Sequence, residues 1–152
     1  MTLSTPYTLR TFRFPEDYPA VYNLWANAGP GIQLRVSDEP EEIAKKVAHD
    51  PDLFVVAENE NGEIIGAVMA GFDGRRGLIY HLAVDANYRQ HGLGTALMDE
   101  IEKRLRAKGC LRAYLMVVPG EKEVLAFYRK RGWENLPVIT LAKNLTSDHP
   151  SS

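Results

Sequence analysis

The stretch from residue 82 to residue 97 constrains this chain more than any other part of its sequence. It reads LAVDANYRQHGLGTAL, an apolar strand pattern followed by a short loop and an amphipathic helix pattern. Gly92 and Gly94 allow the backbone to approach a ligand closely. The first turn of the helix leaves N–H groups unpaired and adds partial positive charge, and Arg89 can add a charge-assisted contact. The stretch therefore predicts a phosphate-binding loop.

Two competing phosphate-binding motifs do not fit this stretch. A dinucleotide fingerprint G-x-G-x-x-G/A requires Gly or Ala at position 97, where the chain has Leu97. No Gly-Lys followed by Ser or Thr occurs, which excludes a nucleotide-triphosphatase loop. A plain glycine-rich turn without a ligand remains the alternative.

The rest of the sequence predicts one domain over residues 1–152, with flexible tails at about residues 1–6 and 146–152. We expect an α/β (α+β) fold, in which a mixed, mostly antiparallel sheet of about six to seven strands has helices on both faces. The expected strands cover residues 7–14, 53–57, 64–69, 78–84, 113–118 and 138–145. The expected helices begin at Pro15, near Asp38 or Glu39, after Gly92 and at Glu121. Their predicted buried residues are Tyr18, Val21, Tyr22, Trp25, Ile43, Val47, Leu93, Ala96, Leu97, Ile101, Leu105, Val124, Phe127 and Tyr128.

Composition excludes several classes of protein. A formal net charge of −2 gives no electrostatic case for binding nucleic acid or an anionic membrane. One cysteine, Cys110, cannot form an internal disulfide. No apolar run approaches the ~18 residues of a membrane span, and no secretory signal is visible at the N-terminus. We therefore expect a cytoplasmic protein, a monomer or homodimer, with no metal.

Together these features resemble the GCN5-related N-acetyltransferase (GNAT) superfamily, and more narrowly its small bacterial members of the YpeA type. The resemblance covers nearly the whole chain and implies a GNAT fold and acetyl-CoA as cosubstrate. It implies that the backbone of Leu82, Ala83 and Val84 pairs with the pantetheine arm. The implied pyrophosphate loop is Arg89, Gln90, His91, Gly92, Leu93, Gly94 and Thr95. The sequence departs from the family pattern at Glu121, where many relatives carry Asn, and at Trp133, where Phe is usual.

The same resemblance implies roles for the catalytic groups. A backbone N–H near Leu82 polarises the thioester carbonyl, and Tyr128 is the candidate proton donor to the leaving thiolate. Packing of Tyr128 beside Phe127 is the alternative. Relatives often place a base at positions that alternate with Leu82, but Leu78 and Tyr80 are not bases at neutral pH. His81 is one residue out of phase and should face the other side of the strand unless a bulge intervenes.

The acceptor is expected to be an amine, a small molecule or else a protein N-terminus or lysine. Without an obvious base, an α-amine is favoured, because neutralising a lysine at pH 7 costs about 4.6 kcal/mol and an α-amine only about 1 kcal/mol. The candidate acceptor residues are Trp25, Leu34, Arg35, Asp73, Arg75 and Tyr80. A packed tryptophan, solvated arginines and turn chemistry at Asp73 are the alternatives. A non-catalytic acyl-CoA sensor or interaction domain is the alternative function.

Overall fold

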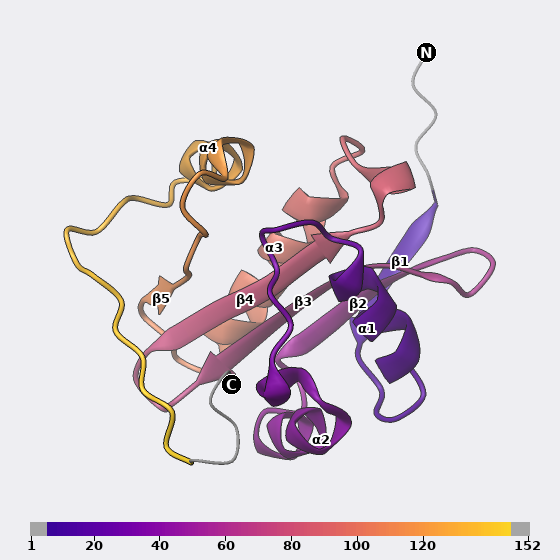
Figure 1. The fold of residues 1–152 in the computed structure, drawn as a ribbon. Coiled ribbons are helices and arrows are strands. Elements are labelled where there is room, and N and C mark those ends of the chain that lie inside the picture. The colour runs from indigo at the N-terminus through magenta and orange to yellow at the C-terminus, as the bar shows by residue number, and fades with distance from the viewer. Residues whose placement is uncertain (1–5, 147–152) are drawn as a thin grey trace.

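A computed structural model, which describes residues 6–146, is built around a five-stranded sheet in the order β1-β2-β3-β4-β5 (Figure 1). The strands are β1 (Tyr7–Thr11), β2 (Phe54–Asn59), β3 (Ile64–Phe72), β4 (Gly77–Val84) and β5 (Ala113–Tyr114). The helices are α1 (Tyr18–Ala26), α2 (Pro40–His49), α3 (Leu93–Ala107) and α4 (Lys122–Lys130), with short 3₁₀ turns η1 (Val36–Asp38) and η2 (Ala86–Tyr88). The predicted tails at residues 1–5 and 147–152 lie outside the described residues.

The sheet is mixed, as predicted. Strands β1 to β4 pair antiparallel with their neighbours, and β4 pairs parallel with β5. The hairpin between β2 and β3 turns at Asn61-Gly62, where Gly62 takes a φ of 80° that few other residues adopt. The predicted α/β class is confirmed, with five strands rather than six or seven.

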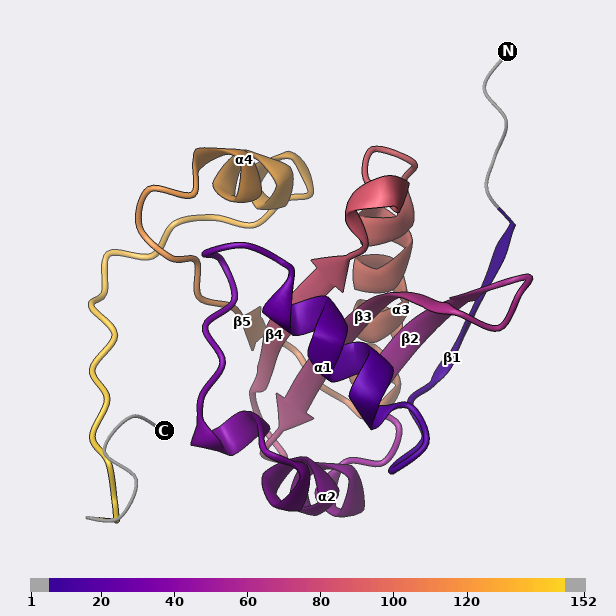
Figure 2. The same ribbon diagram turned by 45° about the vertical axis from the view of Figure 1, so that its right-hand side comes forward.

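Helices cover both faces of the sheet, as Figure 2 shows. On one face α3 buries Leu97, Met98 and Ile101 against the sheet. On the other face α1 and α2 bury Trp25 and Ile43. The alternation of β2 and β3 side chains supplies both cores, which is why these strands read as continuous apolar runs rather than as half-buried ones.

Gly66 sets how closely α3 approaches the sheet. A Cβ atom at this position would lie 2.8 Å from Leu97 Cδ1 and 3.3 Å from Leu93 Cδ2, so these leucine side chains or α3 itself would have to shift. Because Leu93 and Leu97 belong to the first turns of α3, Gly66 also helps to fix the N-terminus of that helix.

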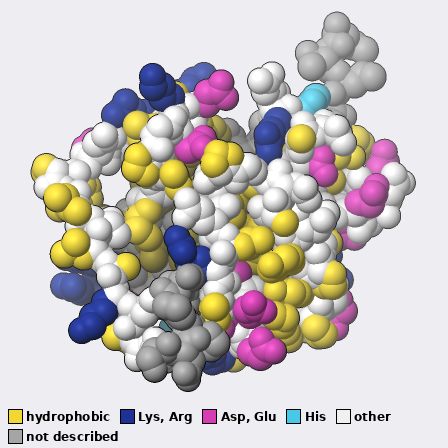
Figure 3. Space-filling model, in the orientation of Figure 1, with side chains coloured by type: hydrophobic (Ala, Val, Ile, Leu, Met, Phe, Trp, Pro, Cys, Tyr) yellow, Lys and Arg dark blue, Asp and Glu magenta, His cyan; other side chains and the backbone are white. Residues whose placement is uncertain are grey.

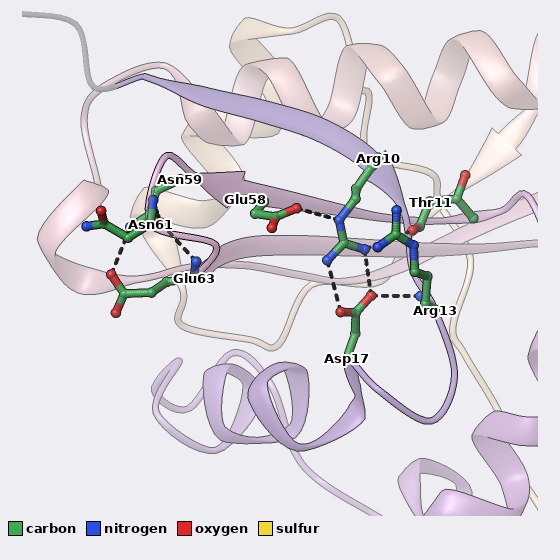
Figure 4. Close-up of polar contacts among 8 residues, drawn as sticks. All are labelled: Arg10, Thr11, Arg13, Asp17, Glu58, Asn59, Asn61 and Glu63. Atoms are coloured by element: carbon green, nitrogen blue, oxygen red, sulfur yellow. Dashed lines mark hydrogen bonds and ion pairs between the residues drawn. The ribbon is translucent and has the colours of Figure 1, made fainter.

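A partly buried ion-pair cluster holds the start of α1 against β1 and β2 (Figure 4). The Arg10 guanidinium donates to Glu58 Oε2 at 2.6 Å and to Asp17 Oδ2 at 2.7 Å. Asp17 Oδ2 also accepts the Arg13 backbone N–H at 2.7 Å. Burial alone would raise the pKa of Asp17, but the bonds from Arg10 and Arg13 outweigh it and hold that pKa below its usual range.

Several predicted details of the helices are wrong. α1 begins at Tyr18 rather than Pro15, because residues 13–18 form turns closed by Asp17 N–H to Arg13 O and Tyr18 N–H to Pro15 O. As a result Leu24 takes the buried place predicted for Tyr22, which is 38% exposed. In α4, Tyr128 faces inward as predicted, whereas Val124 is 37% exposed.

The end of the predicted sheet also differs from the structure. β5 contains two residues rather than six, and residues 138–145 form no strand. Within residues 6–146 no strand pairs with this segment, and Ile139 and Leu141 are 87% and 90% exposed. An alternating pattern is insufficient to make a strand when no backbone partner lies beside it.

Candidate active site

A β-bulge interrupts the pairing of β3 with β4. Ala67 pairs with Ala83 and Met69 pairs with Tyr80, so His81 and Leu82 both lie opposite Val68. His81 takes a φ of 56°, which is uncommon for a residue other than glycine. A bulge of this kind leaves the extra residue outside the ladder and bends the strand. It therefore places unpaired backbone in the middle of β4.

The bulge changes which side chains share a face of the sheet. Neighbouring residues of a regular strand point to opposite faces. Here Tyr80 packs into the core beneath α1 and α2, and the adjacent His81 ring lies 4.9 Å from the Trp25 ring of α1. The two rings of Tyr80 and His81 are 5.9 Å apart and nearly perpendicular. His81 Nε2 lies 2.8 Å from Asp38 Oδ1 in η1.

The edge of β4 is open beyond its first two residues. β4 pairs with β5 only at Gly77–Ala113 and Leu78–Tyr114. From Ile79 to Val84 no strand among the described residues pairs on that side. In Figures 1 and 2, β5 and α4 stand away from this part of β4. The backbone of Leu82, Ala83 and Val84 thus has no strand partner on the side of β5 among the described residues.

This open edge leads directly to the predicted phosphate loop. Gln90 and Gly92 take positive φ angles of 66° and 80°, and α3 begins at Leu93. No side chain caps this helix, and its first turn contains no acidic residue. The N–H groups of Leu93, Gly94 and Thr95 therefore have no acceptor within the helix. An anion at this end would find both free donors and the positive end of the helix dipole.

The side chains of the loop have different surroundings. Arg89, Gln90, His91 and Thr95 are exposed, and Arg89 Nε donates to Val84 O at 3.3 Å. Leu93 is 2% exposed and belongs to the core, so it can offer a ligand only its backbone. Ala83 is likewise buried, at 4% exposed.

Three elements converge at Gly94. A Cβ atom there would lie 3.5 Å from Phe127 Cζ in α4 and 3.9 Å from Val84 Cγ2 at the end of β4. These are ordinary contact distances, and Gly94 has no positive φ. Its place between β4, α3 and α4, rather than its own backbone conformation, makes the absence of a side chain useful.

Tyr128 lies in α4 close to this convergence. Its ring contacts Phe127 and Trp133 edge-on, at 5.2 and 6.2 Å. Burial raises the pKa of Tyr128 to about 12, and the charge of Arg131 opposes that rise. Tyr128 also lines a hollow of about 820 Å³ between β5, α4 and the C-terminal segment, a face that Figure 3 shows hollowed among apolar side chains. The phenol is therefore protonated at neutral pH and adjoins open space.

The predicted acceptor residues do not all meet. Tyr80 and Asp73 line a second hollow of about 510 Å³, beside the paired end of β4. Trp25 is 1% exposed and belongs to the core, and neither Arg35 nor Arg75 lines this hollow. Leu34 packs beneath α1. Trp25 does contact His81, which makes it a neighbour of the site rather than a wall of a pocket.

The second hollow also contains residues that the sequence did not single out. They include Lys46 and Asp50, whose Nζ and Oδ2 atoms are 3.3 Å apart, and Arg76, which stacks on Tyr114. Burial lowers the pKa of Lys46, and Asp50 opposes that effect. The sequence indicates Asp38 only as a candidate helix start, and no sequence spacing links it to His81.

Residues 6–146 contain no group of three His, Cys, Asp or Glu side chains placed to hold a metal ion. Within the same range no helix is long and apolar enough to cross a membrane.

Comparisons with known proteins agree with this geometry. Residues 18–133 match the family model described as Acetyltransferase (GNAT) family. The chain is 43% identical over 141 residues to Acetyltransferase ECA0875 of Pectobacterium atrosepticum, covering 92% of this chain and 96% of that protein. The narrower resemblance to the YpeA type is not tested by these matches and stays a prediction.

Two solved structures share the fold along most of their length. Ard1 from Thermoplasma volcanium superposes with a TM-score of 0.73 at 27% identity, over 95% of this chain and 91% of that one. Naa20 from Chaetomium thermophilum, solved in complex with a bisubstrate analogue, superposes with a TM-score of 0.69 at 25% identity, over 82% and 70%.

Proposed function

Because the chain belongs to the GNAT family of acetyltransferases, we propose that it transfers the acetyl group of acetyl-CoA directly to a primary amine. The observation that carries this proposal is the open edge of β4 that continues into an uncapped helix N-terminus. Together they offer a row of unpaired backbone groups that ends in an anion site, which suits the amide-bearing pantetheine arm and the pyrophosphate of acetyl-CoA.

The cosubstrate would lie along β4 with its pyrophosphate on the N–H groups of Leu93, Gly94 and Thr95. Exposed Arg89, Gln90 and His91 are placed to contact the same phosphates. Leu82, Ala83 and Val84 would pair with the pantetheine arm through backbone atoms alone. This direction brings the thioester to the bulge, where an unpaired N–H can polarise its carbonyl.

Tyr128 is the proposed proton donor to the departing thiolate. The raised pKa keeps it in the donating form, and its position in the hollow beside β5 and α4 is consistent with access to a thioester on β4. The Naa20 structure holds a bisubstrate analogue, and a single site for both substrates supports direct transfer in this chain too.

The proposed acceptor is an amine that enters near Tyr80, with small-molecule amines ahead of protein N-termini and lysines. Tyr80 and Asp73 line the hollow of about 510 Å³ beside the same strand, which is large enough for a small substrate. Lys46, Asp50 and Arg76 add charges of both signs to its wall. This balance suits a polar acceptor with both an amine and an acidic group.

A binding and turnover experiment tests the proposal. We expect calorimetry with acetyl-CoA to give one site per chain, and we expect CoA release with at least one amine from a panel of amino acids, polyamines and peptides. Binding without transfer to any amine would instead favour the acyl-CoA sensor. No binding of acetyl-CoA or CoA would contradict both functions.

A further inference from the structure

We propose that His81 accepts the proton of the acceptor amine through Nδ1, and that Asp38 is the positioning residue that holds His81 for this role. This inference rests on the proposed function, because it assigns the base of the same reaction. It is carried by the contact between two residues 43 positions apart in sequence, brought together by the bulge in β4.

Asp38 is held in place by several hydrogen bonds. Its Oδ1 lies 2.8 Å from His81 Nε2, and its Oδ2 accepts the Arg35 backbone N–H at 3.1 Å. The Tyr18 hydroxyl donates to the Asp38 backbone carbonyl at 2.7 Å. The Asp38 side chain is only 5% exposed, so these partners replace water around it. The carboxylate therefore has a fixed direction toward the imidazole.

This contact selects one tautomer of His81. A carboxylate oxygen accepts hydrogen bonds, so Nε2 carries the ring proton and Nδ1 keeps its lone pair. No residue among 6–146 donates to or accepts from Nδ1, and the His81 side chain is 18% exposed. Nδ1 is thus a free proton acceptor in a ring that belongs to the bulge of β4. Once protonated, the imidazolium would be stabilised by Asp38, as in other carboxylate–histidine pairs.

The surroundings of His81 show two unfavourable features that a purely structural histidine would not need. Its φ of 56° costs about 1–3 kcal/mol for a residue that is not glycine. Trp25 Nε1, in the ring that contacts His81, is buried without a hydrogen-bond partner in the described structure. A buried unpaired donor costs about 1–3 kcal/mol. Backbone strain and an unsatisfied buried donor are both more frequent near functional sites than elsewhere in a fold.

The bulge supplies both groups that the reaction needs on the acceptor side. Its unpaired backbone N–H polarises the thioester carbonyl, and the imidazole belongs to the same bulge, in which His81 and Leu82 lie opposite Val68. The acceptor arrives as an ammonium and gives one proton to His81 Nδ1, which frees the nitrogen lone pair to attack the carbonyl carbon. A C–N bond forms, the C–S bond breaks, and the thiolate takes one proton from Tyr128. The new amide nitrogen returns its second proton to the Tyr128 oxygen and His81 releases its proton to solvent, so atoms and charges balance.

Two tyrosines near His81 stay protonated at neutral pH. Tyr18 of α1 has its pKa raised to about 12 by burial, and burial also raises the pKa of Tyr80 on β4. Asp38 of η1 faces the ring directly, and Arg35 contacts Asp38 through its backbone.

The first test replaces the base and keeps its hydrogen bond. In His81→Gln, the Gln Nε2 stands the same number of bonds from the backbone and can still donate to Asp38, but nothing accepts the amine proton. We expect kcat at pH 7 to fall about 10²-fold with the Kd for acetyl-CoA within threefold of wild type. The ratio of wild-type to variant kcat should shrink as pH rises from 7 to 10, because the amine then arrives neutral. A fall in kcat of the same size at every pH from 7 to 10 would show that His81 has a structural role instead.

The second test reverses the tautomer. In Asp38→Asn the amide oxygen can keep the Arg35 N–H while the amide N–H points at His81 Nε2, which forces the ring proton onto Nδ1. We expect a loss of kcat similar to that of His81→Gln, without a matching rise in KM for acetyl-CoA. Asp17→Asn is the matched control, because Asp17 is also buried and also accepts a backbone N–H, from Arg13. Asp17→Asn should lower the free energy of unfolding and leave kcat within twofold of the wild-type value.

Nuclear magnetic resonance of the histidine ring nitrogens separates this inference from the proposed function. We expect the Nε2–H tautomer of His81 in the wild-type protein and the Nδ1–H tautomer in Asp38→Asn. An Nδ1–H tautomer in the wild type would overturn the inference even if the enzyme acetylates amines. A wild type that binds acetyl-CoA but acetylates no amine would overturn the proposed function, whichever tautomer is observed. Activity in His81→Gln above half of wild type at pH 7 would overturn the role of His81 alone.

Discussion

Gly94→Ala separates cofactor binding from folding more cleanly than any other change in the loop. The new methyl group would lie 3.5 Å from Phe127 Cζ and 3.9 Å from Val84 Cγ2, which are ordinary contacts, and the backbone has no positive φ to strain. Alanine is the better helix former by up to ~1 kcal/mol, so the melting temperature should hold or rise. Gly92→Ala is less clean, because a φ of 80° is strained for alanine.

The cost in binding follows from where the methyl group points. It enters the space between α3, α4 and the end of β4, beside the N–H groups that would hold the pyrophosphate. Losing one charge-assisted hydrogen bond costs about 1.5–3 kcal/mol, which corresponds to a Kd for acetyl-CoA raised roughly 10- to 150-fold. Gly94→Val should raise the Kd for acetyl-CoA further than Gly94→Ala.

Calorimetry of acetyl-CoA binding, paired with thermal melts, measures both quantities. Gly31→Ala is the matched control, because a Cβ there meets nothing within 4 Å and Gly31 has no positive φ. It should change neither the Kd nor the melting temperature. A Gly94→Ala protein that melts like wild type and binds acetyl-CoA within twofold of it would refute the location of the phosphate site.

Three further predictions concern other parts of the chain. Tyr128→Phe should lower kcat about 10²-fold and leave the Kd for acetyl-CoA unchanged. Any descending limb of the wild-type pH profile that reflects Tyr128 should lie near its pKa of about 12. A variant that keeps more than half of the wild-type kcat would show that Tyr128 only packs. Gly66→Ala should destabilise the fold by about 1–3 kcal/mol in urea titrations, because its Cβ would meet Leu97 Cδ1 at 2.8 Å. An unchanged midpoint of urea unfolding would show that the Leu97 side chain or α3 moves aside at no cost in stability. The lowered pKa of Asp17 stabilises the fold at pH values above the pKa that Asp17 has in the unfolded chain, and this stabilisation is lost as pH falls through the pKa of Asp17 in the folded protein. Asp17→Asn should therefore weaken the fall in the free energy of unfolding at acid pH. Parallel curves of unfolding free energy against pH for wild type and variant would contradict this prediction.

Sequence reasoning succeeded where local pattern and final structure agree. The glycine loop and α3 were predictable because an apolar strand, Gly92 and a helical apolar stripe all indicate the same arrangement. The antiparallel order of β2, β3 and β4 followed from turn residues at Asn61-Gly62 and residues 71–77. The predicted strand at residues 138–145 failed because strand formation depends on a partner, and partner choice is not encoded in alternation.

Of the candidate site, the sequence predicts the loop and helix N-terminus that we propose for the cofactor, but not the assembly of the proposed acceptor side. Loop residues that act through backbone N–H groups are contiguous in sequence, so a short motif reveals them. The acceptor half is assembled from η1, α1, α2 and β4, and nothing in the spacing of Asp38, Trp25 and His81 indicates that they meet. Arg35 and Arg75 were plausible by charge alone, yet neither lines the hollow that Tyr80 lines.

One extra residue in β4 explains why the contact between His81 and Asp38, to which we assign the proton transfer, could not be predicted. A strand with a strict period of two would have sent Tyr80 and His81 to opposite faces, and the imidazole would have been separated from the aromatic core beneath α1. With two residues opposite Val68, both rings turn toward α1, one backbone N–H leaves the ladder, and His81 reaches Asp38. Histidine is among the residues enriched at positive φ, which is the only local hint that position 81 could accommodate this geometry. The bulge thus moves a strained histidine, an unpaired N–H and a buried carboxylate into one place, and the proposed proton transfer depends on all three.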